Sequence, residues 1–141
     1  SITVMMQKEV ADRIVAEPGS KAYGALSVAV QYYCTVTHVA NVSKEVFFPR
    51  PKVDSTVIRL DLRNEKHIQL NDEDAFFAVV KAGFGQRRKT LLNSLTGIYG
   101  LTKDEIGSII KNAGIDPARR AETLQLQEFA ALANMIRPKN N

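Results

Sequence analysis

The sequence has one cysteine, two histidines and no tryptophan among its 141 residues. The single thiol, Cys34, has no second cysteine to pair with, which is typical of a reducing, cytoplasmic compartment. One cysteine and two histidines are too few for the usual Cys/His zinc site. No apolar run approaches the roughly 20 residues that a membrane helix needs, and no signal peptide is visible. We therefore expect a cytoplasmic protein without a metal or a membrane partner.

Charge of either sign is also modest. Nineteen basic and fifteen acidic residues leave a net charge of +4, and 45% of the residues are hydrophobic. This composition indicates a globular chain of about one domain rather than a disordered one. The positive charge is clustered, because Lys81, Arg87, Arg88 and Lys89 fall within nine residues that contain no acid. This segment is a candidate site for an anion.

Apolar periodicity divides the chain into two parts. Up to residue 66 we expect strands at 2–6, 35–42 and 55–62, a helix at 8–16, and a segment at 26–34 whose length favours a helix over a strand. The proline-rich connection at 47–51 predicts that the last two strands pair antiparallel. The first strand has the composition of a buried strand, which needs neighbours on both sides. We therefore expect it either at a sheet edge or next to an upstream part that has been removed.

From residue 67 to 141 the period changes to that of helices. We expect a helix from the acidic start at 71–74 that is broken or capped by Gly83 and Gly85, and a second helix at 90–99. Thr102 and Glu105 resemble a capping box that opens a third helix, and the last runs from 126 to 136. The fold class is therefore α+β in residues 1–66 and all-α in residues 67–141.

The segment Phe47 to Ser55 combines two adjacent aromatics with Arg50 and Lys52. Pro49 and Pro51 restrict the backbone on both sides of Arg50, so the loop is stiff. Aromatic rings on a stiff loop are suited to stacking on unpaired bases, and the cations are suited to contacting phosphate. The alternative is a loop whose rings fill the core and whose cations are solvated.

The segment Phe84 to Leu95 places Arg87, Arg88 and Lys89 at the expected start of a helix. Positive charge there opposes the helix dipole unless an anion binds, and phosphate is the obvious anion. The alternative is a solvated basic turn.

Five segments, in order along the chain, resemble the KsgA-type ribosomal RNA adenine dimethyltransferases. They are residues 2–13, 18–24, 47–55, 84–95, and 117–124 with 128–133. Members of that family use S-adenosylmethionine to place two methyl groups on N6 of each of two adjacent adenines in small-subunit ribosomal RNA. The resemblance implies the last strands of a Rossmann-like methyltransferase sheet in residues 1–66, followed by a helical RNA-binding domain in residues 67–141.

The resemblance also assigns roles. Phe47 matches the aromatic that stacks on the flipped target adenine, and Gln7 falls near the border of the site without a role. The RNA-binding residues that we assign are Arg50, Lys52, Lys81, Arg87, Arg88 and Lys89. The family's cofactor loop and catalytic motif precede the residues matched here, so we expect this chain alone to bind no S-adenosylmethionine and to be inactive.

The implied partner is small-subunit ribosomal RNA in a 30S-type ribosomal subunit. We also expect self-association through an unprotected sheet edge at residues 2–7. A second hypothesis is a free-standing RNA-binding or ribosome-associated module without catalysis. A parent gene that encodes a glycine-rich loop and an Asn-x-Pro-Tyr motif upstream would favour the first hypothesis.

Overall fold

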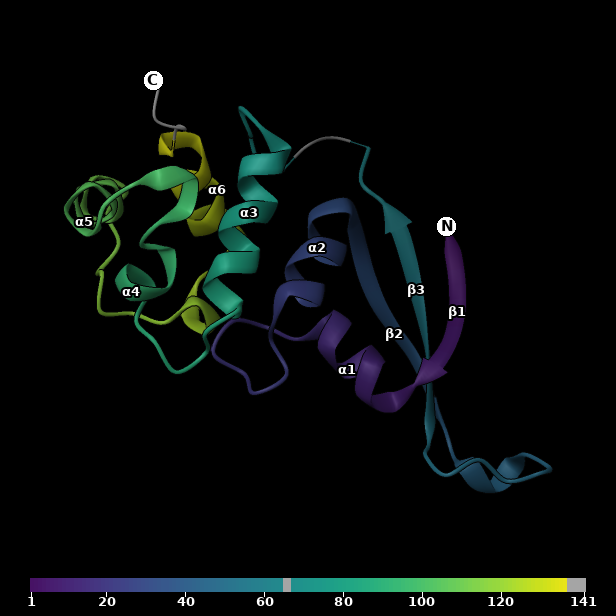
Figure 1. Cartoon of the computed structure of the whole chain (residues 1–141). Coiled ribbons are helices and arrows are strands. Elements are labelled where there is room, and N and C mark those ends of the chain that lie inside the picture. The colour runs from purple at the N-terminus through teal and green to yellow at the C-terminus, as the bar shows by residue number, and fades with distance from the viewer. Residues whose placement is uncertain (65–66, 137–141) are drawn as a thin grey trace. The chain divides into compact units, whose positions relative to one another are not determined.

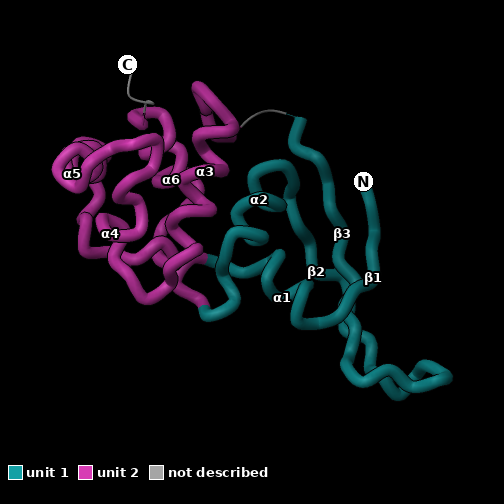
Figure 2. Tube along the Cα trace, viewed as in Figure 1, with its two compact units in different colours: residues 1–17, 21–66 teal, residues 18–20, 67–141 magenta. Residues whose placement is uncertain are grey.

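The computed structural model describes residues 1–64 and 67–136; Figure 1 shows the chain and Figure 2 its two units. Unit 1 comprises Ser1–Glu17 and Lys21–Lys66, and unit 2 comprises Pro18–Ser20 and His67–Asn141. Residues 65–66 and 137–141, which the expected domain ranges include, lie outside the described residues. No helix of the described part of the chain is long and apolar enough to cross a membrane.

Unit 1 contains a three-stranded antiparallel sheet in the order β1-β3-β2. The strands are β1 (Ile2–Gln7), β2 (Cys34–Val42) and β3 (Ser55–Leu62). The predicted antiparallel pairing of the second and third strands is confirmed. The first strand lies at an edge of this sheet, one of the two expected arrangements, and Ile2 and Met5 are more than half exposed there. The central strand β3 instead carries the buried residues of the sheet, Thr56 and Ile58.

Two helices, α1 (Lys8–Val15) and α2 (Ala25–Tyr33), pack on one face of this sheet (Figure 1). The helix that length favoured at 26–34 is therefore confirmed. Ala11, Ile14 and Ile58 form the centre of the core, because their side chains are almost fully buried together. Gln31 of α2 donates hydrogen bonds to the carbonyls of Ile14 and Ala16, both at 2.8 Å. Those bonds satisfy carbonyls that the end of α1 leaves without a partner in the helix.

Unit 2 is helical. Its helices are α3 (Glu73–Phe84), α4 (Leu91–Leu95), α5 (Lys103–Asn112) and α6 (Leu126–Met135), and short 3₁₀ turns lie at η2 (Ile98–Gly100) and η3 (Ala121–Thr123). The capping box is confirmed, because the Glu105 N–H donates to Thr102 Oγ1 and the Thr102 N–H donates to Glu105 Oε1, each at 3.3 Å. The core of the unit is built from fully buried side chains: Phe76, Leu91, Leu95, Ile106, Ile110, Leu124, Phe129 and Leu132.

The expected helix over 90–99 is wrong in length. The helix α4 has only five residues and ends at Leu95. Gly97 follows with φ of +94°, a left-handed conformation that terminates helices and that glycine adopts without steric cost. Helical periodicity alone did not reveal this stop, because Ile98 and Tyr99 continue the apolar pattern in a 3₁₀ turn.

Gly83 belongs to α3, so the expectation that it breaks or caps the helix is wrong; Gly85 is the C-terminal cap. A Cβ atom at Gly83 would lie 2.9 Å from the Cβ of Ala121, closer than real side chains approach. Glycine is therefore needed here for η3 to pack directly against α3. This contact holds residues 117–124 next to the turn that follows α3.

Candidate functional site

A long loop, residues 43–54, joins β2 to β3 and extends beyond the sheet (Figure 1). It begins with the 3₁₀ turn η1 (Lys44–Val46), capped by Ser43, whose Oγ accepts a hydrogen bond from the Glu45 N–H at 3.2 Å. Asp54 closes the loop at its other end. Its Oδ1 accepts a hydrogen bond from the Lys44 N–H at 2.9 Å, and its carbonyl accepts one from the Lys8 N–H at 3.0 Å. These hydrogen bonds hold the two ends of the loop together and attach them to the junction of β1 and α1.

The two adjacent aromatics of this loop differ in exposure. Phe47, the ring that the family resemblance singles out, is half-buried, whereas Phe48 is fully exposed at 101% of its reference area. Arg50 and Lys52 are exposed. The sequence alone suggested that both rings together form one stacking surface. In the structure, Phe47 is half-buried and Phe48 is fully exposed.

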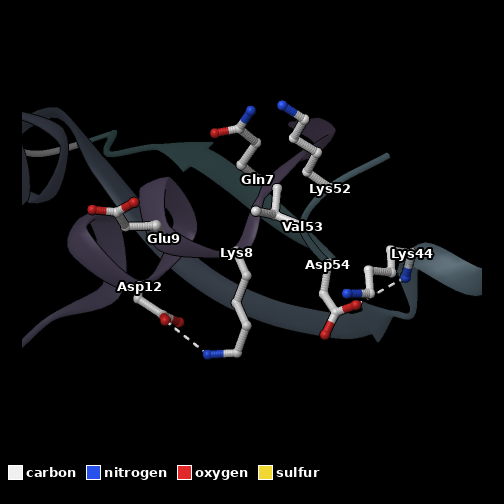
Figure 3. Close-up of a pocket in the computed structure, with 8 residues that line it drawn as sticks. All are labelled: Gln7, Lys8, Glu9, Asp12, Lys44, Lys52, Val53 and Asp54. Carbon is white, nitrogen blue, oxygen red and sulfur yellow. Dashed lines mark hydrogen bonds and ion pairs between the residues drawn. The ribbon is translucent and has the colours of Figure 1, made fainter. Parts of the chain in front are cut away.

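An open pocket of about 410 Å³ lies where the end of β1 meets the base of the loop (Figure 3). The Lys8 ammonium donates to the Asp12 carboxylate at 2.8 Å, and this hydrogen bond raises the pKa of Lys8 above its ordinary value. The wall of the pocket includes the predicted RNA-binding residue Lys52 and the border residue Gln7. The complete lining is Gln7, Lys8, Glu9, Asp12, Lys44, Lys52, Val53 and Asp54.

In unit 2, the cations Arg87, Arg88 and Lys89 lie in a turn that precedes α4, whose N-terminal cap is Thr90. The N–H groups at the start of α4 already have acceptors within the chain. The Leu91 N–H donates to the Arg119 carbonyl at 2.6 Å, and the Leu92 N–H donates to the Pro117 carbonyl at 3.2 Å.

The next donor of α4 is also used, because the Asn93 N–H donates to Thr90 Oγ1 at 3.3 Å. An anion at this turn must therefore be held by side chains rather than by helix N–H groups. The basic turn also follows the C-terminus of the 12-residue helix α3, where positive charge is favourable.

The cations of this turn have different surroundings. Arg87 lies 3.8 Å from the Glu122 carboxylate, in an ion pair between half-exposed groups. Arg88 and Lys89 are exposed, as is Lys81 in the last turn of α3. The exposed cations are therefore the better candidates for a phosphate contact, because Arg87 already has an acidic neighbour.

Arg119 holds the segment that supports this turn, and sequence reasoning gave it no role. Its guanidinium donates to both Glu128 oxygens, at 2.5 and 3.1 Å, and to the Thr123 carbonyl at 2.7 Å. Partial burial acts to raise the pKa of Glu128, but hydrogen bonds from Arg119 and from the Gln125 N–H, with the charge of Arg119, lower it below its ordinary value. The bidentate pair therefore ties residues 119–123 to the start of α6.

The described residues hold neither a cluster of possible metal ligands nor a glycine turn between β1 and α1. Within residues 1–64 and 67–136, no group of three or more His, Cys, Asp or Glu side chains could hold a metal ion. The strand β1 passes directly into α1 between Gln7 and Lys8, without the glycine turn that binds a nucleotide cofactor in Rossmann-like folds. The pocket of Figure 3 is lined by seven polar or charged side chains and by Val53.

The sequence profile of one family, described as ribosomal RNA adenine dimethylase, matches residues 1–137. The chain belongs to this family. It is 57% identical over 138 residues to the ribosomal RNA small subunit methyltransferase A of Clostridioides difficile (strain 630), covering 98% of this chain and 48% of that relative. It is 50% identical over 136 residues to the protein of the same name from Oceanobacillus iheyensis, covering 95% of this chain and 46% of that relative. The chain thus spans about half the length of the curated relatives it matches.

Solved structures agree with the family membership. A dimethyladenosine transferase from Plasmodium falciparum superimposes with a TM-score of 0.74 at 26% identity, over 92% of this chain and 54% of that one. The 23S rRNA methyltransferase ErmE superimposes with a TM-score of 0.65 at 21% identity, over 94% of this chain and 53% of that one, and shows likeness of fold.

Proposed function

We propose that this chain is the C-terminal, RNA-contacting portion of a cytoplasmic enzyme that dimethylates N6 of two adjacent adenines in small-subunit ribosomal RNA. Membership of the ribosomal RNA adenine dimethylase family and the name of the 57% identical relative support this proposal. The structural observation that carries it is the fastened loop 43–54, which presents Phe47 beside Arg50 and Lys52. In this proposal, unit 1 completes a Rossmann-like methyltransferase sheet and unit 2 is an RNA-binding domain.

Phe47 is proposed to stack on the target adenine. The N6 amino group is out of reach inside a duplex, so the base must leave the helix before it can be methylated. A half-buried ring on a loop whose two ends are fastened has little freedom to lose when a base stacks on it, which lowers the entropic cost of binding. Arg50 and Lys52, four and two residues before the anchor Asp54, are proposed to contact the neighbouring phosphates.

S-adenosylmethionine supplies the methyl group in the proposed reaction, and we propose that this chain does not hold it. No strand in the part of the chain that the structure describes leads through a glycine-rich turn into a helix. We propose that the cofactor is held by the half of the full-length relatives that this chain does not match. We propose further that the edge of β1 is a contact surface, for a second copy or for other segments of the same sheet.

Cofactor binding gives the first test. Calorimetric titration of the 141-residue chain with S-adenosylmethionine should show no binding, because no strand of its described residues leads through a glycine-rich turn into a helix. The full-length relative from Clostridioides difficile is the positive control. Binding to the chain alone with micromolar affinity would contradict the division of roles proposed here.

The basic turn gives the second test. Replacing Arg88 and Lys89 together with alanine should reduce the log–log salt dependence of RNA binding by up to about 2 units, if each cation neutralises about one phosphate. The substitution should change the free energy of unfolding by less than about 0.5 kcal/mol, because both side chains are exposed. The measurement is RNA affinity across a salt series.

The matched control replaces Lys103 and Lys111 of α5 with alanine, which removes the same charge elsewhere in unit 2. Both control residues are exposed. The control should leave the salt dependence within about half a unit of that of the unmodified chain. An equal log–log salt dependence of RNA binding in the two double variants would mean that Arg88 and Lys89 face solvent and contact no phosphate. Adding Arg87→Ala should lower the slope by less than one further unit, because Arg87 is paired with Glu122.

A further inference from the structure

Phe48 is the one large hydrophobic side chain of the described residues that is completely exposed, at 101%. It is not an isolated surface residue, because Val46 and Val53 of the same loop are 69% and 46% exposed. The loop therefore exposes three apolar side chains to solvent, and Phe48, midway along the loop, forms its tip. Apolar surface that a chain leaves exposed is typical of interaction sites.

The tip is supported by a rigid base. Asp54 accepts hydrogen bonds from the N–H groups of Lys44 and Lys8, which close the two ends of the loop on each other and on α1. Pro49 and Pro51 restrict the backbone immediately after the ring. The backbone that carries the ring is therefore restricted before a partner binds, which lowers the conformational entropy that binding costs.

The charges around the ring indicate what kind of partner it suits. Arg50 and Lys52 are exposed and follow Phe48 by two and four residues. The Asp54 carboxylate accepts the Lys44 N–H at the base of the loop. A planar apolar ring next to two cations is complementary to a planar base next to phosphates.

We propose that Phe48 is a second stacking residue, which holds an unpaired base next to the target adenine in single-stranded RNA. The proposal rests on the proposed function and deepens it: Phe47 takes the reacting base, and Phe48 takes a neighbouring base and so sets the preference for unpaired RNA. Arg50 and Lys52 hold the phosphates on either side of that base. Duplex RNA is a poor ligand for this tip, because its bases are stacked on each other.

The absence of tryptophan from the sequence gives a direct probe. Phe48→Trp introduces the only indole of the chain at the proposed contact. A short single-stranded oligoadenylate should quench its fluorescence in a saturable manner, and a blunt RNA duplex of the same length should not. Val46→Trp is the matched control, because Val46 is exposed in the same loop but is not assigned a base. Its emission should change much less.

Affinity gives the second readout. Phe48→Ala should weaken binding of the oligoadenylate by about 5- to 150-fold, the loss expected when one base loses its aromatic partner, and should leave duplex binding unchanged. Phe48→Leu should behave like the alanine variant, and Phe48→Tyr like the unmodified chain, if stacking rather than apolar bulk is responsible. Since the ring is fully exposed, all variants should keep the Tm of the unmodified chain.

The outcomes separate this proposal from the one it rests on. If the unmodified chain binds the oligoadenylate and Phe48→Ala binds it equally well, the role of Phe48 is wrong and the proposed function stands. If the unmodified chain binds neither RNA, both proposals fail. Binding of the chain to vesicles of phosphatidylserine and phosphatidylcholine that is lost in Phe48→Ala, without an effect on RNA, would assign the tip to a membrane and overturn the proposal.

Discussion

Replacing Arg119 with alanine is expected to lower the free energy of unfolding of unit 2 by about 2–3 kcal/mol, because charge-assisted hydrogen bonds are worth more than neutral ones. The substitution removes both bonds to the partly buried Glu128 carboxylate and the bond to the Thr123 carbonyl. It also frees the segment whose Arg119 carbonyl accepts the Leu91 N–H at the start of α4. Thermal unfolding should show a fall in Tm of at least about 8 °C.

The adjacent residue gives a matched control. Arg120 has the same charge and is exposed, so Arg120→Ala should change the free energy of unfolding by less than about 0.5 kcal/mol. Arg119→Lys should recover only part of the loss, because an ammonium group cannot make the two-point contact with Glu128. Equal Tm values for Arg119→Ala and Arg120→Ala would show that the pair contributes nothing measurable.

The same pair predicts a dependence on pH. The pKa of Glu128 is lower in the folded chain than its ordinary value of 4.5, so its contribution to stability is present above that value. The contribution is lost as the pH falls through the lowered pKa, where the carboxylate becomes protonated. The Tm of the unmodified chain should therefore fall more steeply between neutral pH and about pH 3 than the Tm of Glu128→Gln. Parallel pH profiles would contradict the assignment.

Phe47→Ala is expected to reduce the rate of adenine methylation by about 5- to 150-fold in a full-length family member that carries this chain as its C-terminal portion. Stacking on one base is worth roughly 1–3 kcal/mol, and here it acts mainly after the target base has left the helix. Affinity for the RNA substrate should change less than about twofold, because the remaining contacts hold the RNA before that step. Single-turnover methylation at saturating RNA measures the first quantity, and equilibrium binding measures the second.

The neighbouring ring provides the control for this experiment. Phe48→Ala should show the opposite pattern, with weaker binding and a nearly normal rate at saturating RNA. Phe47→Tyr should retain most of the rate, since it keeps an aromatic face. Equal losses of rate and affinity in Phe47→Ala, accompanied by a lower Tm, would identify Phe47 as a packing residue of unit 1.

Local patterns were sufficient to predict most of the helices and strands. Alternation at Ser55–Leu62 predicted β3, and Thr102 with Glu105 predicted the start of α5, because both depend on neighbours within a few residues. The end of α4 was not predicted correctly, since the left-handed Gly97 interrupts a pattern that Ile98 and Tyr99 continue. The family was evident from the order of five motifs, and the match over residues 1–137 confirms it.

The surroundings of the candidate RNA-contacting residues depended on the tertiary structure. The sequence by itself determined that aromatic and basic residues occur together at 47–52 and at 84–89, and that the chain belongs with adenine dimethyltransferases. Only the tertiary structure decided that Phe47 is half-buried while Phe48 is fully exposed. It also decided that Arg87, among the three exposed cations of the turn, lies next to the Glu122 carboxylate. The N–H groups of Leu91 and Leu92, at the start of α4, donate to carbonyls 28 and 25 residues away in the chain. Such contacts join residues far apart in sequence, and no local periodicity encodes them.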